Sequence, residues 1–136
     1  MPHVTKVKVR FYELDPYNHV NHASYIQYFE SARVELLEEA GIGLSELKDR
    51  GYFLVVTELA TKFHKSAGGG DILRIETEVA ELRRASSRWR QRMLRGDELI
   101  ASQEIGAATT SLEGRPVRFP DHVADALAPY LADPAA

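Results

Sequence analysis

Polar and apolar residues alternate near the start of the chain. In residues 6–12, Val7, Val9 and Phe11 stand on one side and basic residues stand on the other. This period of two predicts a half-buried strand. From residue 23 to residue 40 the apolar positions instead recur at helical spacing, which predicts a helix that is buried on several sides. Its stripe consists of Tyr25, Phe29, Ala32, Leu36 and Ala40, widened by Ile26, Val34 and Leu37.

Both ends of this predicted helix carry their own signals. Ser24 and Gln27 have the spacing of a capping box, and Gly41 stands where a C-terminal cap is expected. A helix of about 18 residues is a rod of about 27 Å, because each residue adds about 1.5 Å. Such a rod is long enough to cross a whole sheet.

Four further strands are predicted at residues 53–65, 72–82, 86–94 and 99–112. Glycine and aspartate between them supply turn chemistry. The strand at 72–82 alternates most regularly, which indicates one buried and one wet face. The small residues at 105–108 allow another backbone to come close, and we expect the long helix to be that neighbour.

The order of these elements predicts a fold class. One strand, a long helix and four strands favour an α+β fold, in which an antiparallel sheet of about five strands wraps around one long central helix. Residues 44–50 are expected to form a short helical turn, residues 120–131 a terminal helix or coil, and residues 132–136 a frayed tail. Because no linker or repeat interrupts them, residues 1–131 are expected to be a single domain.

Composition narrows the class of protein. A chain of 136 residues can bury a core large enough to fold without disulfides or bound metals. The lack of cysteine excludes disulfides, thiolate zinc sites and cysteine nucleophiles. That composition suits a reducing cytosol. A net charge of -3 and a pI near 5.9 argue against a nucleic-acid binder. The sequence has neither an apolar run of about 20 residues nor a signal-peptide core, so we expect a cytoplasmic protein that does not bind membranes.

The residues whose side chains are best suited to catalysis lie between the first predicted strand and the long helix. Residues 15–22 hold a carboxylate, two imidazoles and two amides, namely Asp15, His19, His22, Asn18 and Asn21. This position places Asp15 beside a helix N-terminus, where backbone N–H groups of residues 22–24 can polarise a carbonyl. Acyl transfer needs such an oxyanion site and a carboxylate that acts as a general base or nucleophile.

Other roles stay open for the same residues. Asp15 also suits a plain turn. Asp15, His19 and His22 have the donor types of a zinc site, although three close donors on one loop are a weak metal signal. Asn18 and Asn21 can hold the loop, and capping the helix is the preferred interpretation for Asn21.

The run VRFYELDPYNHVNH at residues 9–22, followed by Tyr25, Phe29, Glu30, Ala32 and Arg33, resembles the hot-dog-fold acyl-CoA thioesterases. The resemblance spans nearly the whole chain. It points to the 4-hydroxybenzoyl-CoA thioesterase-like branch, particularly its bacterial long-chain acyl-CoA thioesterases, and residues 19–21 are also similar to plant acyl-ACP thioesterases. The chain departs from the family at Phe11, where some members have a tyrosine, and at 63–67, where the aromatic remains without the proline.

The resemblance implies a hot-dog fold and the hydrolysis of acyl-CoA thioesters to a carboxylic acid and coenzyme A. It implies that Asp15 is the catalytic carboxylate, that His22 assists, and that the reaction uses neither a metal nor a cofactor. Members pair edge to edge with the pocket between subunits, so a homodimer or homotetramer is expected. The alternatives are an acyl-ACP thioesterase and a non-catalytic acyl-thioester-binding module. A hot-dog dehydratase would need a histidine and acid arrangement that the sequence lacks.

Six side chains are candidates for binding the substrate, and they are Asn18, His19, Tyr25, His64, Lys65 and Arg88. Tyr25, one turn into the helix, suits either a pocket wall or the core. Lys62, His64 and Lys65 together form a candidate phosphate patch.

Arg88, Arg90 and Arg92 form an arginine stripe on one face of a predicted strand. Guanidinium groups suit the phosphates of coenzyme A. For most of the stripe the favoured interpretation is pairing across strands, because a solvated charged face is the common case. The expected partners are Glu76, Glu78 and Glu81.

Overall fold

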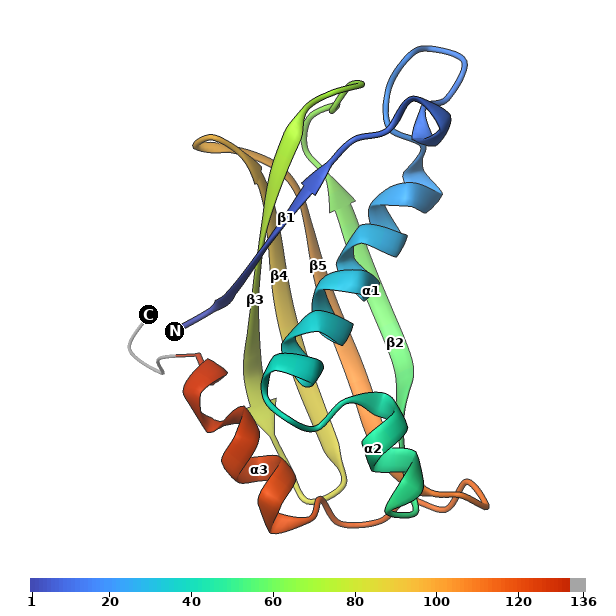
Figure 1. Ribbon diagram of the computed structural model, residues 1–136, viewed down its shortest axis with the longest axis vertical. Helices are drawn as coiled ribbons and strands as arrows, with labels where there is room; N and C mark the ends of the chain where they lie inside the picture. Colours follow the sequence, from blue (N-terminus) through green and yellow to red (C-terminus); the bar gives the residue numbers. More distant parts are fainter. Residues whose placement is uncertain (133–136) are drawn as a thin grey trace.

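A computed structural model describes residues 1–132 of the chain (Figure 1). Its strands are β1 (His3–Lys8), β2 (Tyr52–Phe63), β3 (Ile72–Leu82), β4 (Ser86–Arg95) and β5 (Glu98–Ser111). Its helices are α1 (His22–Glu39), α2 (Leu44–Asp49) and α3 (Asp121–Leu127), with short 3-10 turns η1 (Phe11–Glu13) and η2 (Ala128–Tyr130). None of the helices in residues 1–132 is both long and apolar enough to cross a membrane.

The five strands form one antiparallel sheet in the order β1-β3-β4-β5-β2. This confirms the predicted five-stranded sheet. The first two strands of the sequence therefore lie at its two edges. Helix α1 packs on one face of the sheet, where Phe29 and Leu36 join buried strand residues in the two core clusters (Figure 1).

The predicted strand at residues 6–12 is wrong at both ends. β1 begins at His3, and it ends at Lys8 opposite Ile72, the first residue of β3. Beyond that point no strand remains to pair with, so the chain turns into η1 and leaves Phe11 83% exposed. The inward phase of the alternation is nevertheless right, because Val9 is buried.

Polar residues at inward positions concealed the true start of β1. His3 and Thr5 are buried, and their partners stand on α1. His3 Nε2 lies 2.6 Å from Glu39, and the Thr5 hydroxyl donates to Glu35 at 3.1 Å. An alternation test that counts only apolar residues cannot recognise these positions.

Helix α1 starts and ends by different devices. Its N-cap is Asn21, whose side chain accepts from the N–H of Ala23 at 2.9 Å, so the predicted Ser24 capping box is wrong and the capping role of Asn21 is confirmed. At the other end Gly41 adopts a φ of +78°, as the prediction of a glycine cap requires.

The register of β5 corrects one further expectation. A Cβ atom on Gly106 would lie 2.9 Å from the Glu58 side chain and 3.2 Å from Thr57, so the close neighbour of this glycine is β2 and not the long helix. The pairing of β2 with β5 shifts by one residue at this point, between Val56 and Glu58. The bulge and the glycine therefore accommodate each other.

The C-terminal segment folds back on the sheet. α3 and η2 account for the predicted terminal helix, and Val123 and Leu127 are buried against the core. Of the predicted tail, Ala132 is held in place because its N–H donates to the carbonyl of Val79 at 2.8 Å. Residues 133–136 lie outside the described residues.

Candidate active site

The segment that carries Asp15 is a small closed loop between β1 and α1. Leu14 and Val20 form a bridge across its base. Inside the loop the N–H of Asp15 donates to the carbonyl of His19 at 2.7 Å, and the N–H of Asn18 donates to the carbonyl of Asp15 at 3.0 Å. Asn18 occupies the left-handed region with a φ of 61°, which asparagine tolerates better than most residues. This places Asn18 in the turn that shapes the loop.

The two oxygens of Asp15 are in different situations. Oδ1 accepts backbone N–H groups from Tyr17 at 2.8 Å and from His19 at 3.1 Å. Oδ2 makes no hydrogen bond with any residue of 1–132. One oxygen is thus fixed by the loop, and the partly exposed carboxylate keeps the other for a substrate or a water molecule.

The N-terminus of α1 offers fewer N–H donors than its sequence suggests. Asn21 takes the N–H of Ala23 on its side chain and that of Ser24 on its carbonyl, the latter at 2.9 Å. The N–H of His22 has no partner among the described residues. Of the expected donors at residues 22–24, the His22 N–H is therefore the one that is left to bind an oxyanion.

Tyr25 ties this end of α1 to the loop between β2 and β3. Its hydroxyl accepts the N–H of Ala67 at 3.0 Å, and its ring packs on Phe63 at 5.3 Å between centroids. Ala67 in turn accepts from the N–H of Val20 at 2.8 Å. Burial raises the pKa of Tyr25, and the N–H of Ala67 opposes that shift. The phenol therefore stays protonated and keeps its own proton available to donate.

The other predicted residues lie at different distances from this centre. His19 bridges to Gly68, so the Asp15 loop and the β2–β3 loop meet at one end of the molecule (Figure 1). His64 lies exposed beside Ser102 at 3.0 Å, and Lys65 pairs with Glu98 at 3.0 Å. These side chains line the same end of the sheet as Asp15.

Arg88 does not lie at this end of the sheet. It stands seven residues before Arg95 on β4, about 23 Å along the strand at about 3.3 Å per residue. Arg88 pairs with Glu58 at 2.7 Å, which is not one of the three glutamates expected to pair with the stripe. The two other members of the arginine stripe pair across strands as predicted, Arg90 with Glu78 and Arg92 with Glu76.

An ion-pair network braces the β2–β3 loop. Arg95 donates to Asp71 at 2.8 Å and to the carbonyl of Ser66 at 3.2 Å, and Asp71 also accepts the N–H of Gly68 at 2.9 Å. The Gly68 N–H and the Arg95 guanidinium lower the pKa of Asp71. The network holds the loop against the chain that carries His19.

Two residues near the site escaped the sequence analysis. The hydroxyl of Tyr28 donates to the carboxylate of Glu13 at 2.7 Å, and burial, with the Glu13 carboxylate beside it, raises the pKa of Tyr28. Tyr28 follows Tyr25 at helical spacing and Glu13 precedes Asp15 by two residues, so spacing and proximity were the available signals.

The described residues add no further ligand to the zinc site considered for Asp15, His19 and His22. Within residues 1–132 no three histidine, aspartate or glutamate side chains are grouped to hold a metal ion. The site therefore consists of a carboxylate with one oriented oxygen, a helix N-terminus with an N–H left over, and a buried phenol.

The chain belongs to the Thioesterase-like superfamily, whose sequence profile matches residues 9–127. It is 31% identical over 119 residues to the acyl-CoA thioesterase YbgC of Haemophilus influenzae, a match that covers 86% of this chain and 88% of that protein. It is 29% identical over 123 residues to the chloroplastic acyl-acyl carrier protein thioesterase ATL2 of Arabidopsis thaliana, with 89% of this chain and 65% of that protein covered.

Solved structures agree with this assignment. A hypothetical protein from Thermus thermophilus superposes with a TM-score of 0.86 at 33% identity, covering 93% of this chain and 98% of that one. The fold and the family expected from residues 9–33 are therefore confirmed, and the sheet is that of a hot-dog thioesterase fold.

Proposed function

We propose that this protein is an acyl-CoA thioesterase that hydrolyses acyl-CoA to a carboxylic acid and coenzyme A, with Asp15 as its catalytic carboxylate. The observation that carries the assignment of Asp15 is the asymmetry of its two oxygens. Loop N–H groups fix Oδ1, and Oδ2 accepts no hydrogen bond from residues 1–132. Family membership supports the reaction, because two relatives that cover 86% and 89% of the chain are named thioesterases.

In the proposed reaction Asp15 activates water. Oδ2 takes a proton from a water molecule while the water oxygen bonds to the thioester carbon, and the carbonyl becomes an oxyanion that accepts the His22 N–H. When the C–S bond breaks, the thiolate of coenzyme A takes the proton back from Asp15. In the alternative course Oδ2 itself bonds to the carbonyl carbon and expels the thiolate, and water then hydrolyses the resulting anhydride. Both courses need the same oxygen of Asp15.

The remaining predicted residues have subsidiary roles in this proposal. The His22 imidazole, exposed at the first turn of α1, assists proton transfer, and the Tyr25 hydroxyl faces the bound thioester. Asn18 and His19 shape the rim of the site through the Asp15 loop. His64 and Lys65 stand where the phosphates of coenzyme A would leave the site, since both are exposed at the same end of the sheet.

A second copy of the chain completes the proposed enzyme. β2 is an edge strand with a row of exposed apolar side chains, which are Val55, Val56, Leu59 and Phe63 at 43–50% exposure. Such an edge invites pairing with another strand. We infer a homodimer that joins β2 to β2. Arg88 would lie near this interface, because it forms an ion pair with Glu58 on β2. Pairing of two such dimers would give a homotetramer.

The proposal extends to the organisation of the chain. Residues 1–131 act as one hot-dog domain in which the sheet wraps around α1 as its central helix, with both core clusters between them. The absence of cysteine from the sequence favours the cytoplasm as its location.

An acyl-ACP thioesterase is the second candidate, favoured by the match to ATL2 over 89% of this chain. A thiol-release assay with matched acyl-CoA and acyl-ACP substrates distinguishes the two. We expect release from acyl-CoA, and release from acyl-ACP alone would replace the first proposal by the second. A protein that binds both thioesters and releases no thiol would instead be the non-catalytic module.

A further inference from the structure

Arg33 is a partly buried cation on α1, between the helix and the sheet. Its Nη1 donates to the side-chain oxygens of Gln91 and Gln103, each at 2.8 Å. Both glutamines are buried, and their amide nitrogens donate elsewhere, Gln91 to the Phe29 carbonyl at 2.8 Å and Gln103 to Thr61 at 2.7 Å. These bonds fix the oxygen of each amide toward the arginine. One nitrogen of the guanidinium is thereby held in place.

The charge of Arg33 is not neutralised by this arrangement. It forms no ion pair with a residue of 1–132, and its Nε and Nη2 donate to none of them. Burial lowers the pKa of the guanidinium, and the Glu30 carboxylate opposes that shift less strongly. A charge removed from water is costly unless it is paired, so an anion beside Arg33 would be favourable. The Nε–H and the two N–H groups of Nη2 are the three donors available to it.

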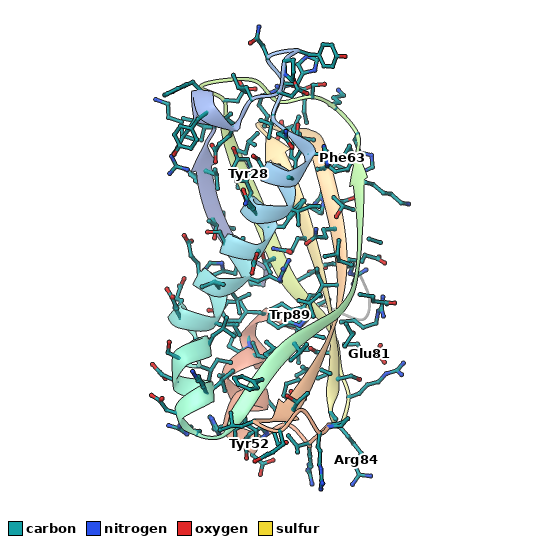
Figure 2. All side chains as sticks on the ribbon, turned by 90° about the vertical axis from the view of Figure 1, so that its right-hand side faces the viewer. Tyr28, Tyr52, Phe63, Glu81, Arg84 and Trp89 are labelled. Carbon is teal, nitrogen blue, oxygen red and sulfur yellow. The ribbon has the colours of Figure 1, made fainter. Side chains whose placement is uncertain are left out.

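A cavity of about 90 Å³ lies against Arg33, between α1 and β2. Most of its wall is apolar and includes Leu54, Trp89 and Ile105. Figure 2 shows Trp89 between the helix and β2 when the molecule is viewed from the β2 side. At about 10–15 Å³ for each water-sized group, the cavity of about 90 Å³ has room for at least about six non-hydrogen atoms. A carboxylate followed by about three methylene groups has that size.

The proposed dimer brings this cavity toward a catalytic loop. Two β2 strands that pair about a two-fold axis run antiparallel, so the Phe63 end of one meets the Tyr52 end of the other. These residues stand at opposite ends of β2 (Figure 2). Tyr25, at the start of α1 just after the Asp15 loop, packs against Phe63 at one end of β2. The cavity is lined by Leu54 and Val56 in the other half of β2. An acyl group attacked by one subunit can therefore extend into the cavity of the other.

We propose that Arg33 selects acyl groups that end in a carboxylate, so that ω-carboxyacyl thioesters are preferred over alkanoyl thioesters of equal length. This inference rests on the proposed thioesterase activity and on pairing through β2. The terminal carboxylate accepts two N–H groups from Nε and Nη2 in the side-on geometry that guanidinium favours. The methylene groups contact Trp89 and Ile105.

The test compares adipyl-CoA with hexanoyl-CoA, which have six-carbon acyl groups that differ only at the far end. The wild-type protein is expected to hydrolyse adipyl-CoA with a kcat/KM at least about tenfold higher, the scale of a charge-assisted contact. Arg33→Met is expected to reduce this ratio about tenfold or more, while hexanoyl-CoA is still hydrolysed. Arg115→Met, which removes an exposed arginine from a distant loop, is the matched control and should keep the ratio.

The ratio stays meaningful if Arg33→Met folds less well, because both substrates are measured on the same preparation. Glu30→Gln, which removes a carboxylate from the cavity wall, is expected to raise the ratio. A wild-type preference for hexanoyl-CoA would overturn the inference. So would an equal loss of both activities in Arg33→Met, which would mean that the arginine only ties α1 to the sheet. Hydrolysis of neither thioester would overturn the proposed function itself, and this inference with it.

Discussion

Tyr28 on α1 donates a hydrogen bond of 2.7 Å to the carboxylate of Glu13, two residues before Asp15. The same carboxylate accepts the N–H of Arg10 at 2.8 Å, and the carbonyl of Glu13 accepts the N–H of Asn21 at 2.8 Å. Glu13 therefore joins the chain before the Asp15 loop, the chain after it and the second turn of α1. In this way Glu13 helps to fix the position of Asp15 relative to the helix N-terminus.

Loss of this bond should impair catalysis more than binding. We expect Tyr28→Phe to lower kcat about tenfold with little change in KM, because Asp15 loses its position and the substrate keeps its contacts. Glu13→Gln should be close to the wild type, since an amide oxygen still accepts from Tyr28. Tyr130→Phe, in the C-terminal η2, is the control for loss of a phenol elsewhere. If kcat stays normal in Tyr28→Phe, Glu13 does not position the loop.

The arginine stripe should divide into two functional groups. Arg90 and Arg92 pair with Glu78 and Glu76 on the outer face, so replacing both with alanine should leave KM for acyl-CoA unchanged within about twofold. Arg88→Ala should raise this KM, and it should not alter hydrolysis of a pantetheine thioester that lacks the nucleotide. Equal effects of Arg88→Ala on both substrates would remove Arg88 from the substrate site.

The oligomeric state depends on the exposed side of β2. Sedimentation of the wild-type protein at micromolar concentration should give at least twice the 15.3 kDa of one chain. Leu59→Arg places a charge within the apolar row and should shift the protein toward the monomer, with loss of activity. Val4→Arg, on the exposed face of the opposite edge strand β1, is the matched control and should remain assembled. A wild-type protein that sediments only as a monomer would contradict the β2 interface.

The contribution of the β2–β3 loop to the stability of the folded protein should depend on pH in the acid range. The pKa of Asp71 is lowered by Gly68 and Arg95, so its carboxylate stabilises the folded state above the ordinary pKa of about 4, and this contribution is lost as the pH falls through the lowered value. We therefore expect Asp71→Asn to be less stable than the wild type at pH 6, with the difference shrinking toward pH 3. Denaturant unfolding at several pH values measures it. A difference that is constant over this range would exclude the ion pair as its cause.

Much of the fold follows from period alone. The alternation of residues 72–82 and the helical stripe of residues 25–36 correspond to β3 and α1, because buried apolar side chains decide both patterns. The start of β1 was missed because His3 and Thr5 are buried against carboxylates on α1. Contacts between residues 30 or more positions apart leave no local signal.

In the candidate site, too, local sequence predicted some features, and contacts in the folded chain determined the others. Density of functional groups was enough to single out Asp15 and the start of α1. Which N–H groups are already occupied depends on the Asn21 cap, and which oxygen of Asp15 remains depends on the loop, so neither could be read from composition. The position of Arg33 in a cradle of two glutamines from separate strands required the assembled sheet.

The central claim is that Oδ2 of Asp15 performs the chemistry, and the most direct test is free-thiol release by Asp15→Asn. Asparagine keeps an oxygen that can accept the N–H groups of Tyr17 and His19, so the loop should stay folded while the base or nucleophile is lost. We predict a rate of acyl-CoA hydrolysis that is reduced by about 100-fold or more, with an unchanged circular dichroism spectrum and melting temperature. Turnover close to that of the wild type in a folded Asp15→Asn protein would contradict the account.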